Sequence, residues 1–384
     1  AKGLLERAIR EQPTETQYYG MLAQVYDELG DQDKALEMYK LALVQDPDDS
    51  MTRISLAQYY YDLGKQEEAF EQLREAFADP DLDVDPKMQL LLGFYQMTQD
   101  AGAPPSARIV EESHALIAVL KKAHPQSGKP FSIEGDFLLR EGRHAEAREA
   151  FRQALVFEQD KYPIWSALLQ LDMQLADYAA THADAEQAIE LFPTQPEFHL
   201  YNGIALSQLK KHQEAIEALL TGRDLVVDNE PLLAQFWSSL GDAYNSAEQF
   251  QDSDRAYERA LALNANDISV LNNYAYYLSE RGEHLDKAET MSRRTVDMAP
   301  GVSTYLDTYA WVLYKQGKYA DARIWQEKAL AAGPPEGVLL EHYGDILFKL
   351  GDAQGAVEQW KKAKAAGDAS DLIDRKVGEG RLVE

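Results

Sequence analysis

The feature of this sequence that most constrains its fold is an internal repeat with a period of 34 residues. The residues that recur in the first two units are Tyr19, Leu22, Ala23, Tyr26, Gly30, Ala35, Tyr39, Ala42 and Pro47, followed 34 positions later by Arg53, Leu56, Ala57, Tyr60, Gly64, Ala69, Leu73, Ala76 and Asp81. Near the other end, the same spacing relates Ala310, Gly317, Ala322 and Ala329 to Gly344, Gly351, Ala356 and Ala363. A unit of this length cannot bury an apolar face alone, so the period predicts a stack of similar units sharing one core.

Each unit carries two segments with the apolar spacing of an amphipathic helix. In the first segment the apolar residues stand at i, i+3, i+4 and i+7, as in Tyr19, Leu22, Ala23 and Tyr26. This spacing places them on one helical face. A glycine such as Gly30 follows, and glycine ends helices because it adopts the left-handed conformation at little cost. The second segment carries small residues and stops near a proline. The pattern predicts one helical hairpin per unit.

This pattern resembles the tetratricopeptide repeat, which has large, Leu, small and Tyr residues on its first helix, A, and Ala, aromatic, Ala and Pro on its second helix, B. The helix A position that usually holds a small residue marks ten repeats, at Ala23, Ala57, Gly93, Gly135, Leu169, Gly203, Gly241, Ala275, Ala310 and Gly344, and Leu169 departs from the pattern. The resemblance covers nearly the whole chain and implies an all-α fold, a single right-handed α-solenoid. The expected repeats are 16–49, 50–83, 86–127, 128–161, 162–195, 196–231, 234–267, 268–302, 303–336 and 337–368.

The two ends of the chain depart from a complete repeat. Residues 1–13 match helix B of a truncated repeat, which predicts a further repeat or a capping helix ahead of Ala1. Residues 369–384 are expected to form a capping helix, because terminal units need a more polar outer face.

Two intervals between repeats exceed the period by four residues or more. The helix A positions Gly93 and Gly135 are 42 residues apart, and Gly203 and Gly241 are 38 apart. The first excess is assigned to a Gly- and Pro-containing loop around residues 101–106. The second is assigned to the connection around residues 228–231. Such changes are ordinary drift in connecting loops or mark binding loops, and the sequence leaves both open.

The charge and composition exclude several classes of function. Lys and Arg number 38 against 65 for Asp and Glu, a formal net charge of −27, whereas nucleic acids and anionic membranes bind through clustered cations. The chain has no cysteine, which rules out disulfides, thiolate catalysis and zinc knuckles. No apolar run approaches the roughly 18 residues that span a bilayer. We expect no nucleic-acid partner and no insertion of this segment into a membrane.

The motifs of catalysis and cofactor binding are missing from the sequence. The eight histidines never form HExxH or a metal-ligand pair on one helix face. Phosphate-binding glycine loops and nucleophile elbows are likewise not found. Paired acids such as Glu67 and Glu68 are interpreted as solvated surface. We therefore expect no catalytic residues, no metal and no cofactor, and interpret the chain as a non-enzyme.

The resemblance implies that one face of helix A lines an inner groove that binds a peptide or protein segment. The main candidate site, read at the groove positions of the eighth to tenth repeats, comprises Asn272, Tyr276, Asp307, Trp311, Tyr314, Glu341, Asp345 and Phe348. A secondary apolar patch in the second and third repeats comprises Ile54, Tyr61, Leu90, Phe94 and Met97. Aromatic residues rimmed by carboxylates favour a protein partner that is basic or of mixed charge. The alternative is that the C-terminal aromatics only pack between neighbouring A helices.

One binding mode of the family is rejected on the residues. A carboxylate clamp for acidic C-terminal peptides needs Lys, Asn and Arg at set positions of helix A. In the seventh to ninth repeats only Asn273 matches, while Ser238 and Asp242 stand where other clamp residues belong. An acidic peptide would also meet a strongly acidic chain.

A second resemblance concerns the setting of the protein. Residues 271–330 are similar to the terminal repeats of bacterial envelope tetratricopeptide proteins, many of which are lipoproteins. This implies a periplasmic or outer-membrane-associated protein with a possible lipid anchor upstream, and a cytoplasmic setting stays open. A competing interpretation is a structural component that self-associates through its convex face. The expected state is a monomer or a weak homo-oligomer.

Overall fold

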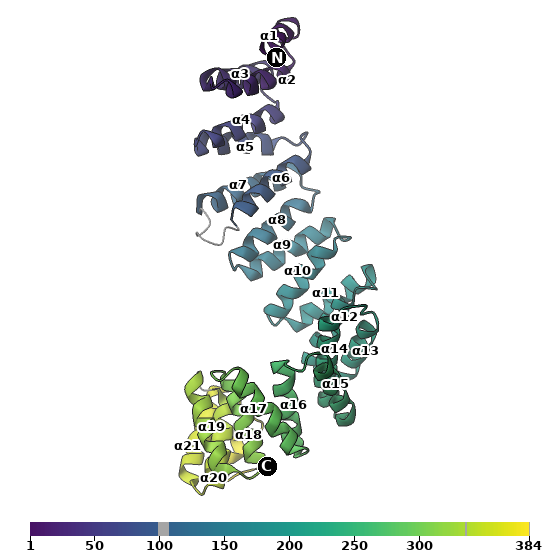
Figure 1. Cartoon of the computed structure of the whole chain (residues 1–384), viewed down its shortest axis with the longest axis vertical. Helices are drawn as coiled ribbons and strands as arrows, with labels where there is room; N and C mark the ends of the chain where they lie inside the picture. Colours follow the sequence, from purple (N-terminus) through teal and green to yellow (C-terminus); the bar gives the residue numbers. More distant parts are fainter. Residues whose placement is uncertain (99–106, 335, 384) are drawn as a thin grey trace. The chain divides into compact units, whose positions relative to one another are not determined.

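The computed structural model describes residues 1–98, 107–334 and 336–383. Within these ranges it contains only helices, 22 in number, which confirms the all-α prediction. The predicted loop at 101–106 lies outside the described residues. The chain divides into two compact units, residues 1–180 and 181–384, and in each unit the helices stack pairwise along the sequence (Figure 1).

Every expected repeat corresponds to two consecutive helices. The helices of the first unit are α1 (Lys2–Glu11), α2 (Thr16–Glu28), α3 (Gln32–Gln45), α4 (Ser50–Asp62), α5 (Gln66–Ala78), α6 (Val84–Met97), α7 (Ala107–Ala123), α8 (Lys129–Arg140), α9 (His144–Phe157) and α10 (Tyr162–Gln174). Helix α11 (Tyr178–Leu191) crosses the limit between the units. The second unit continues with α12 (Pro196–Gln208), α13 (His212–Asp224), α14 (Glu230–Ser246), α15 (Phe250–Leu263), α16 (Ile268–Arg281), α17 (Leu285–Met298), α18 (Ser303–Lys315), α19 (Tyr319–Ala332), α20 (Gly337–Lys349), α21 (Ala353–Ala366) and α22 (Ile373–Glu379).

The turn inside each hairpin explains the glycine of the repeat. Gly30 and Gly64 have φ angles of 76° and 74°, in the left-handed region, which confirms their predicted role. Lys210 and Glu248 occupy the same turn in later repeats with φ angles of 61° and 59°. Side chains with a Cβ are strained there, so these two hairpins retain the turn at some cost in stability.

Polar caps set where several helices begin. Helix α6 starts at Val84 and α14 at Glu230, ahead of the predicted repeat starts at 86 and 234. Asp83 accepts a hydrogen bond from the backbone of Asp85, and Asn229 accepts one from Leu232. These caps satisfy backbone donors that the first turn leaves unpaired, and so extend each helix toward its N-terminus.

In several hairpins the core forms where helix B packs on the small residue of helix A. Ala23, Ala57 and Ala275 are almost completely buried. At Gly135 and Gly241 a Cβ would lie 2.6 and 2.7 Å from the ring of an aromatic residue on helix B. Approach this close requires a residue without a side chain, which gives these two glycines a packing role.

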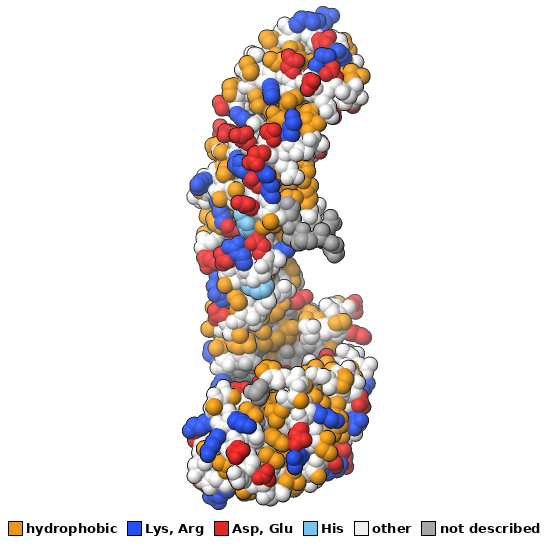
Figure 2. All heavy atoms as spheres, turned by 90° about the vertical axis from the view of Figure 1, so that its left-hand side faces the viewer, with side chains coloured by type: hydrophobic (Ala, Val, Ile, Leu, Met, Phe, Trp, Pro, Cys, Tyr) orange, Lys and Arg blue, Asp and Glu red, His pale blue; other side chains and the backbone are white. Residues whose placement is uncertain are grey.

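The surface carries charges of both signs in the face that Figure 2 shows, where acidic and basic side chains are interspersed among apolar ones. No helix among the described residues is long and apolar enough to cross a membrane.

Candidate functional site

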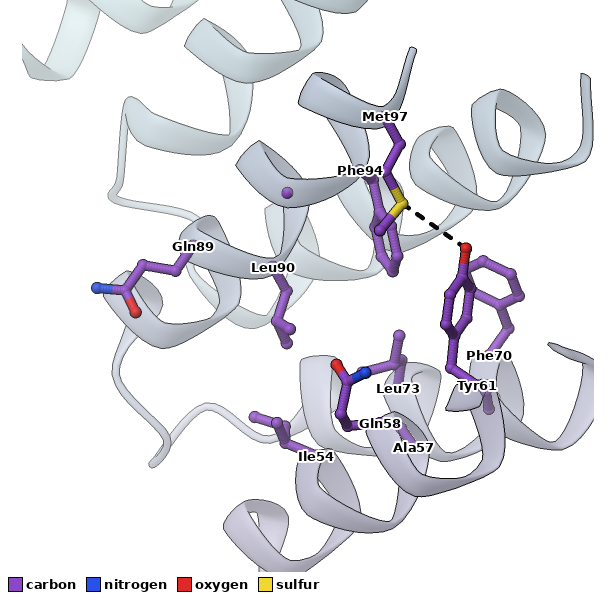
Figure 3. Close-up of a pocket in the computed structure, with 12 residues that line it drawn as sticks. Ile54, Ala57, Gln58, Tyr61, Phe70, Leu73, Gln89, Leu90, Phe94 and Met97 are labelled. Atoms are coloured by element: carbon purple, nitrogen blue, oxygen red, sulfur yellow. Dashed lines mark hydrogen bonds between the residues drawn. The ribbon is translucent and has the colours of Figure 1, made fainter. Parts of the chain in front are cut away.

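The five residues of the predicted secondary patch lie together around one apolar cavity in the first unit. Ile54 and Tyr61 come from α4, and Leu90, Phe94 and Met97 come from α6. Their side chains point toward one another across the space between the two helices (Figure 3). Because α4 and α6 are the A helices of neighbouring repeats, the cavity opens on the face that the sequence assigns to the groove.

The cavity is small and has a defined rim and floor. It holds about 140 Å³. Met97 forms part of the rim, with 48% of its surface exposed, and its Sδ lies 3.6 Å from the Tyr61 hydroxyl. Phe70 from α5 lies beneath, with its ring centroid 5.5 Å from that of Phe94. A space of this shape and lining fits one large apolar side chain.

The hollow arises at Gly93, the small residue of helix A in the third repeat. A Cβ built at Gly93 would meet no atom within 4 Å outside its own helix, whereas one at Gly344 would lie 2.4 Å from Trp360. In other repeats an apolar side chain of helix B, such as Trp360, packs against this residue of helix A. No such side chain of a described residue lies against Gly93, which leaves the hollow. The sequence predicted the residues of the patch. It could not predict the hollow between them, because the hollow depends on where helix B of the same repeat packs.

The predicted C-terminal site is only partly brought together. Tyr276, Trp311, Tyr314, Glu341 and Asp345 line a second pocket of about 410 Å³ in the second unit. The other three predicted residues do not line it. Asn272 and Asp307 are buried, and Phe348 packs near Trp360 with ring centroids 5.8 Å apart.

The aromatic rings of the C-terminal pocket are packed against one another. Trp311 and Tyr314 are only 7% and 5% exposed. Their rings stack with centroids 4.6 Å apart, and Trp311 also stacks on His342 at 3.9 Å. The Trp311 indole N–H donates to Glu280 over 2.6 Å. This geometry fits the packing alternative more closely than an open aromatic surface.

The carboxylates of the same pocket are paired by the chain itself. Lys376 from α22 lies 2.8 Å from Glu341 and 2.7 Å from Asp345, and its side chain is buried. The backbone N–H and the hydroxyl of Ser370 also donate to Glu341, over 2.7 and 2.6 Å. Burial raises the pKa of Glu341, but these hydrogen bonds outweigh it and hold that pKa below its usual value. Glu341 and Asp345 therefore already have hydrogen-bond donors from the chain itself.

A buried polar cluster next to this pocket was not anticipated from the sequence. Asp307 accepts hydrogen bonds from His342 at 3.0 Å and from Gln326 at 2.6 Å. The residues belong to α18, α20 and α19, so the cluster ties consecutive helices together. Asp307 and His342 are 35 residues apart, about one repeat, which places them on neighbouring A helices. The sequence alone does not show that their side chains meet.

Among the residues with described positions, no group of three or more His, Asp or Glu side chains is arranged to hold a metal ion.

The fold defines an α-solenoid built from helical hairpins. Tetratricopeptide-repeat family models match residues 16–49, 51–79, 132–153, 167–225, 234–267 and 302–332. The chain belongs to the tetratricopeptide-repeat family. Proteins of this family generally bind other proteins and are typically non-catalytic.

Solved structures with the same fold are distant in sequence. A tetratricopeptide repeat protein from Parabacteroides merdae is 16% identical with a TM-score of 0.55, covering 66% of this chain and 99% of that one. The crystal structure of the APC/C hetero-tetramer Cut9–Hcn1 includes a chain 13% identical with a TM-score of 0.50, covering 99% of this chain and 86% of that one. At these identities the similarity shows the fold alone.

A curated relative matches part of the chain. The human Protein RRP5 homolog is 22% identical over 285 residues, which is 69% of this chain and 15% of the relative. This chain therefore spans a small part of that protein's length.

Proposed function

We propose that this chain is a non-catalytic scaffold that binds a protein segment along the inner face of its A helices, with the cavity between α4 and α6 as the apolar anchor site. The observation that carries the proposal is the open space at Gly93, bordered by Ile54, Tyr61, Leu90 and Met97. A partly exposed apolar cavity on an otherwise charged protein marks an interaction surface, because contact with water there is unfavourable.

The cavity provides what a binding hot spot needs. Its walls are apolar, its floor is packed, and it receives one side chain from a partner, which excludes water from both surfaces. The acidic balance of the chain favours a partner segment that is basic or of mixed charge. The C-terminal pocket is the weaker candidate, because Lys376 already pairs its carboxylates and its aromatic rings are buried.

A variant that fills the cavity tests the proposal. Gly93→Leu is expected to occupy the hollow and abolish capture of the partner from lysate of the source cell, while Gly93→Ala leaves most of the space open and retains capture. Captured proteins are identified by mass spectrometry, and circular dichroism checks that both variants are folded. Equal capture of the same proteins by wild type and Gly93→Leu would rule out the cavity as the anchor.

A self-associating structural role is the second proposal, and one surface favours it. On α3, Leu36, Leu41 and Val44 line a shallow exposed depression, and Val44 is among the most exposed apolar residues. Sedimentation at increasing concentration measures this directly. Self-association through this surface predicts larger species that Val44→Lys removes, whereas a single species at every concentration would contradict it.

The envelope setting is likewise a proposal, supported by the resemblance of residues 271–330 to terminal repeats of bacterial envelope proteins. Fractionation of the source cell tests it. Recovery with the envelope fraction is expected, and recovery only with the cytoplasmic fraction would contradict it.

A further inference from the structure

Three repeats place a Gly-Asp pair at the same position of helix A, and their local packing is equivalent. The pairs begin at Gly135, Gly241 and Gly344. In each, the site of a missing Cβ lies against an aromatic ring of helix B, that of Phe151, Tyr257 and Trp360 respectively, at 2.4–2.7 Å. The aspartates that follow are therefore held in the same register relative to their own hairpins.

In two of these repeats, hydrogen-bond donors of the chain surround the aspartate. Asp242 accepts a hydrogen bond from Tyr257 over 2.6 Å, and from Asn273 and Tyr277 over 3.4 Å each. Asp345 accepts a hydrogen bond from the Trp360 indole over 2.8 Å, and Lys376 lies 2.7 Å away. One donor stands 15 residues after the aspartate in both cases, and another stands 31 residues after it.

The third aspartate, Asp136, lacks each of these donors. The residues 15, 31 and 35 positions after it are Phe151, Ala167 and Leu171, whose side chains cannot donate. No hydrogen bond to its carboxylate comes from any residue that the structure describes, although the side chain is half-buried. Burial raises the pKa of Asp136 to about 6, opposed by the charge of Arg140.

The cation whose charge acts on the pKa of Asp136, Arg140, forms its hydrogen bonds with other groups. Arg140 stands one turn after Asp136 on α8, where an ion pair could form. Its guanidinium instead donates to the backbone carbonyl of Tyr95 and to the hydroxyl of Thr98, and it lies 3.4 Å from the centroid of the Tyr95 ring. The carboxylate of Asp136 therefore accepts no hydrogen bond from a described residue of this chain. A half-buried carboxylate without a hydrogen-bond donor destabilises the fold.

We propose that Asp136 binds a lysine or arginine side chain of a protein segment lying along the A helices, an inference that rests on the proposed function. The charge and the open acceptor select a cationic donor, which would take the place that Lys376 takes beside Asp345. Asp136 is on α8, the next helix A after α6, and it occupies the same position of the repeat as Phe94 does on α6. Packed helices lie about 10 Å apart, and an extended segment rises about 3.3 Å per residue. The cavity lies between α4 and α6, so it is about one and a half helix spacings, roughly 15 Å, from α8. The bound segment therefore carries a large apolar residue and a basic residue about four positions apart.

A random 12-residue phage-displayed peptide library is the probe that tests this. The library is selected on wild type, on Asp136→Asn, and on Ala167→Lys, which introduces an internal ammonium at the offset of Lys376. Asp242→Asn is the matched control. It changes the aspartate at the equivalent position, which already accepts hydrogen bonds from Tyr257, Asn273 and Tyr277 and is not expected to bind the peptide. Circular dichroism is recorded for every variant.

Selection on wild type and on Asp242→Asn is expected to enrich peptides with Lys or Arg near a large apolar residue. Selection on Asp136→Asn and on Ala167→Lys is expected to enrich the large apolar residue without the basic one. For a selected peptide, Asp136→Asn weakens binding at least about tenfold, as expected for a charge-assisted hydrogen bond. An unchanged basic preference in Asp136→Asn would overturn the inference. Bound peptides without any basic preference in wild type would overturn it and leave the proposed function standing, and a library without binders would contradict both.

Discussion

At the residue scale, the protein places ionisable groups in its core and satisfies most of them locally. His342 is buried between the Asp307 carboxylate and the stacked ring of Trp311. Burial lowers the pKa of His342, but the negative charge of Asp307 outweighs it and the net pKa lies above the usual value. The folded second unit therefore binds this proton more tightly than the unfolded chain does.

This predicts a pH dependence of stability. Because the folded pKa is raised, the stabilisation is complete below the unfolded value of about 6.5 and is lost as the pH rises through the folded pKa. Each unit of pKa difference is worth about 1.4 kcal/mol. Thermal unfolding followed by circular dichroism should show a lower midpoint at pH 9 than at pH 6, with a smaller difference in His342→Asn. The same pH difference in both proteins would show that His342 is not responsible.

The cavity gives a second prediction at this scale, from two glycines at the same position of successive A helices. Gly93→Ala should stabilise the protein by about 0.5–1 kcal/mol, because alanine favours helix and the added methyl meets no neighbour. Gly135→Ala should destabilise it by about 1–3 kcal/mol, because the methyl collides with Phe151. Denaturant titration of the two variants measures both changes. Shifts of the same sign would contradict the difference in packing.

At the element scale, the hairpin and its turn are the part of the fold that the sequence predicts most directly. The spacing of Leu22, Ala23 and Tyr26 fixes one helical face, and Gly30 ends the helix by its left-handed φ angle. Both are local properties of a few neighbouring residues. Turns without glycine, such as the one at Lys210, keep the conformation because packing of the two flanking helices outweighs the local strain.

This strain is measurable. Lys210→Gly should raise the free energy of unfolding by about 1 kcal/mol, since glycine adopts a φ angle of 61° without the steric cost that lysine incurs. Gly317→Ala, at a φ angle of 77° in another hairpin, should lower it by a similar amount. Chemical denaturation of both variants provides the test. A destabilised Lys210→Gly would show that the lysine side chain contributes more than the strain costs.

The candidate sites show where prediction from the sequence stops at this scale. The spacing of Leu90, Phe94 and Met97 predicted a common helical face, and these residues do line one cavity. The spacing of Asn272 and Asp307 suggested groove positions, but both are buried. Whether a side chain on that face remains open depends on the neighbouring helices, which periodicity within one helix does not describe.

At the scale of the whole molecule, the 34-residue period was sufficient to predict the fold class and the family. It was not sufficient to predict which carboxylates are available to a partner. Asp345 and Asp136 occupy equivalent positions, yet Lys376 pairs the first and no described residue pairs the second. That difference comes from residues 31 positions away in sequence, and only the assembled stack shows it.

The central claim is that a partner protein lies against the cavity between α4 and α6. Site-specific photocrosslinking tests it most directly, with a benzophenone amino acid at Met97 on the rim and, as control, at Val156, an exposed position on α9. Irradiation in the source cell is expected to give a defined adduct with one partner from position 97 that Gly93→Leu removes, and no such adduct from position 156. Adducts that form equally from both positions, or that persist in Gly93→Leu, would contradict the claim.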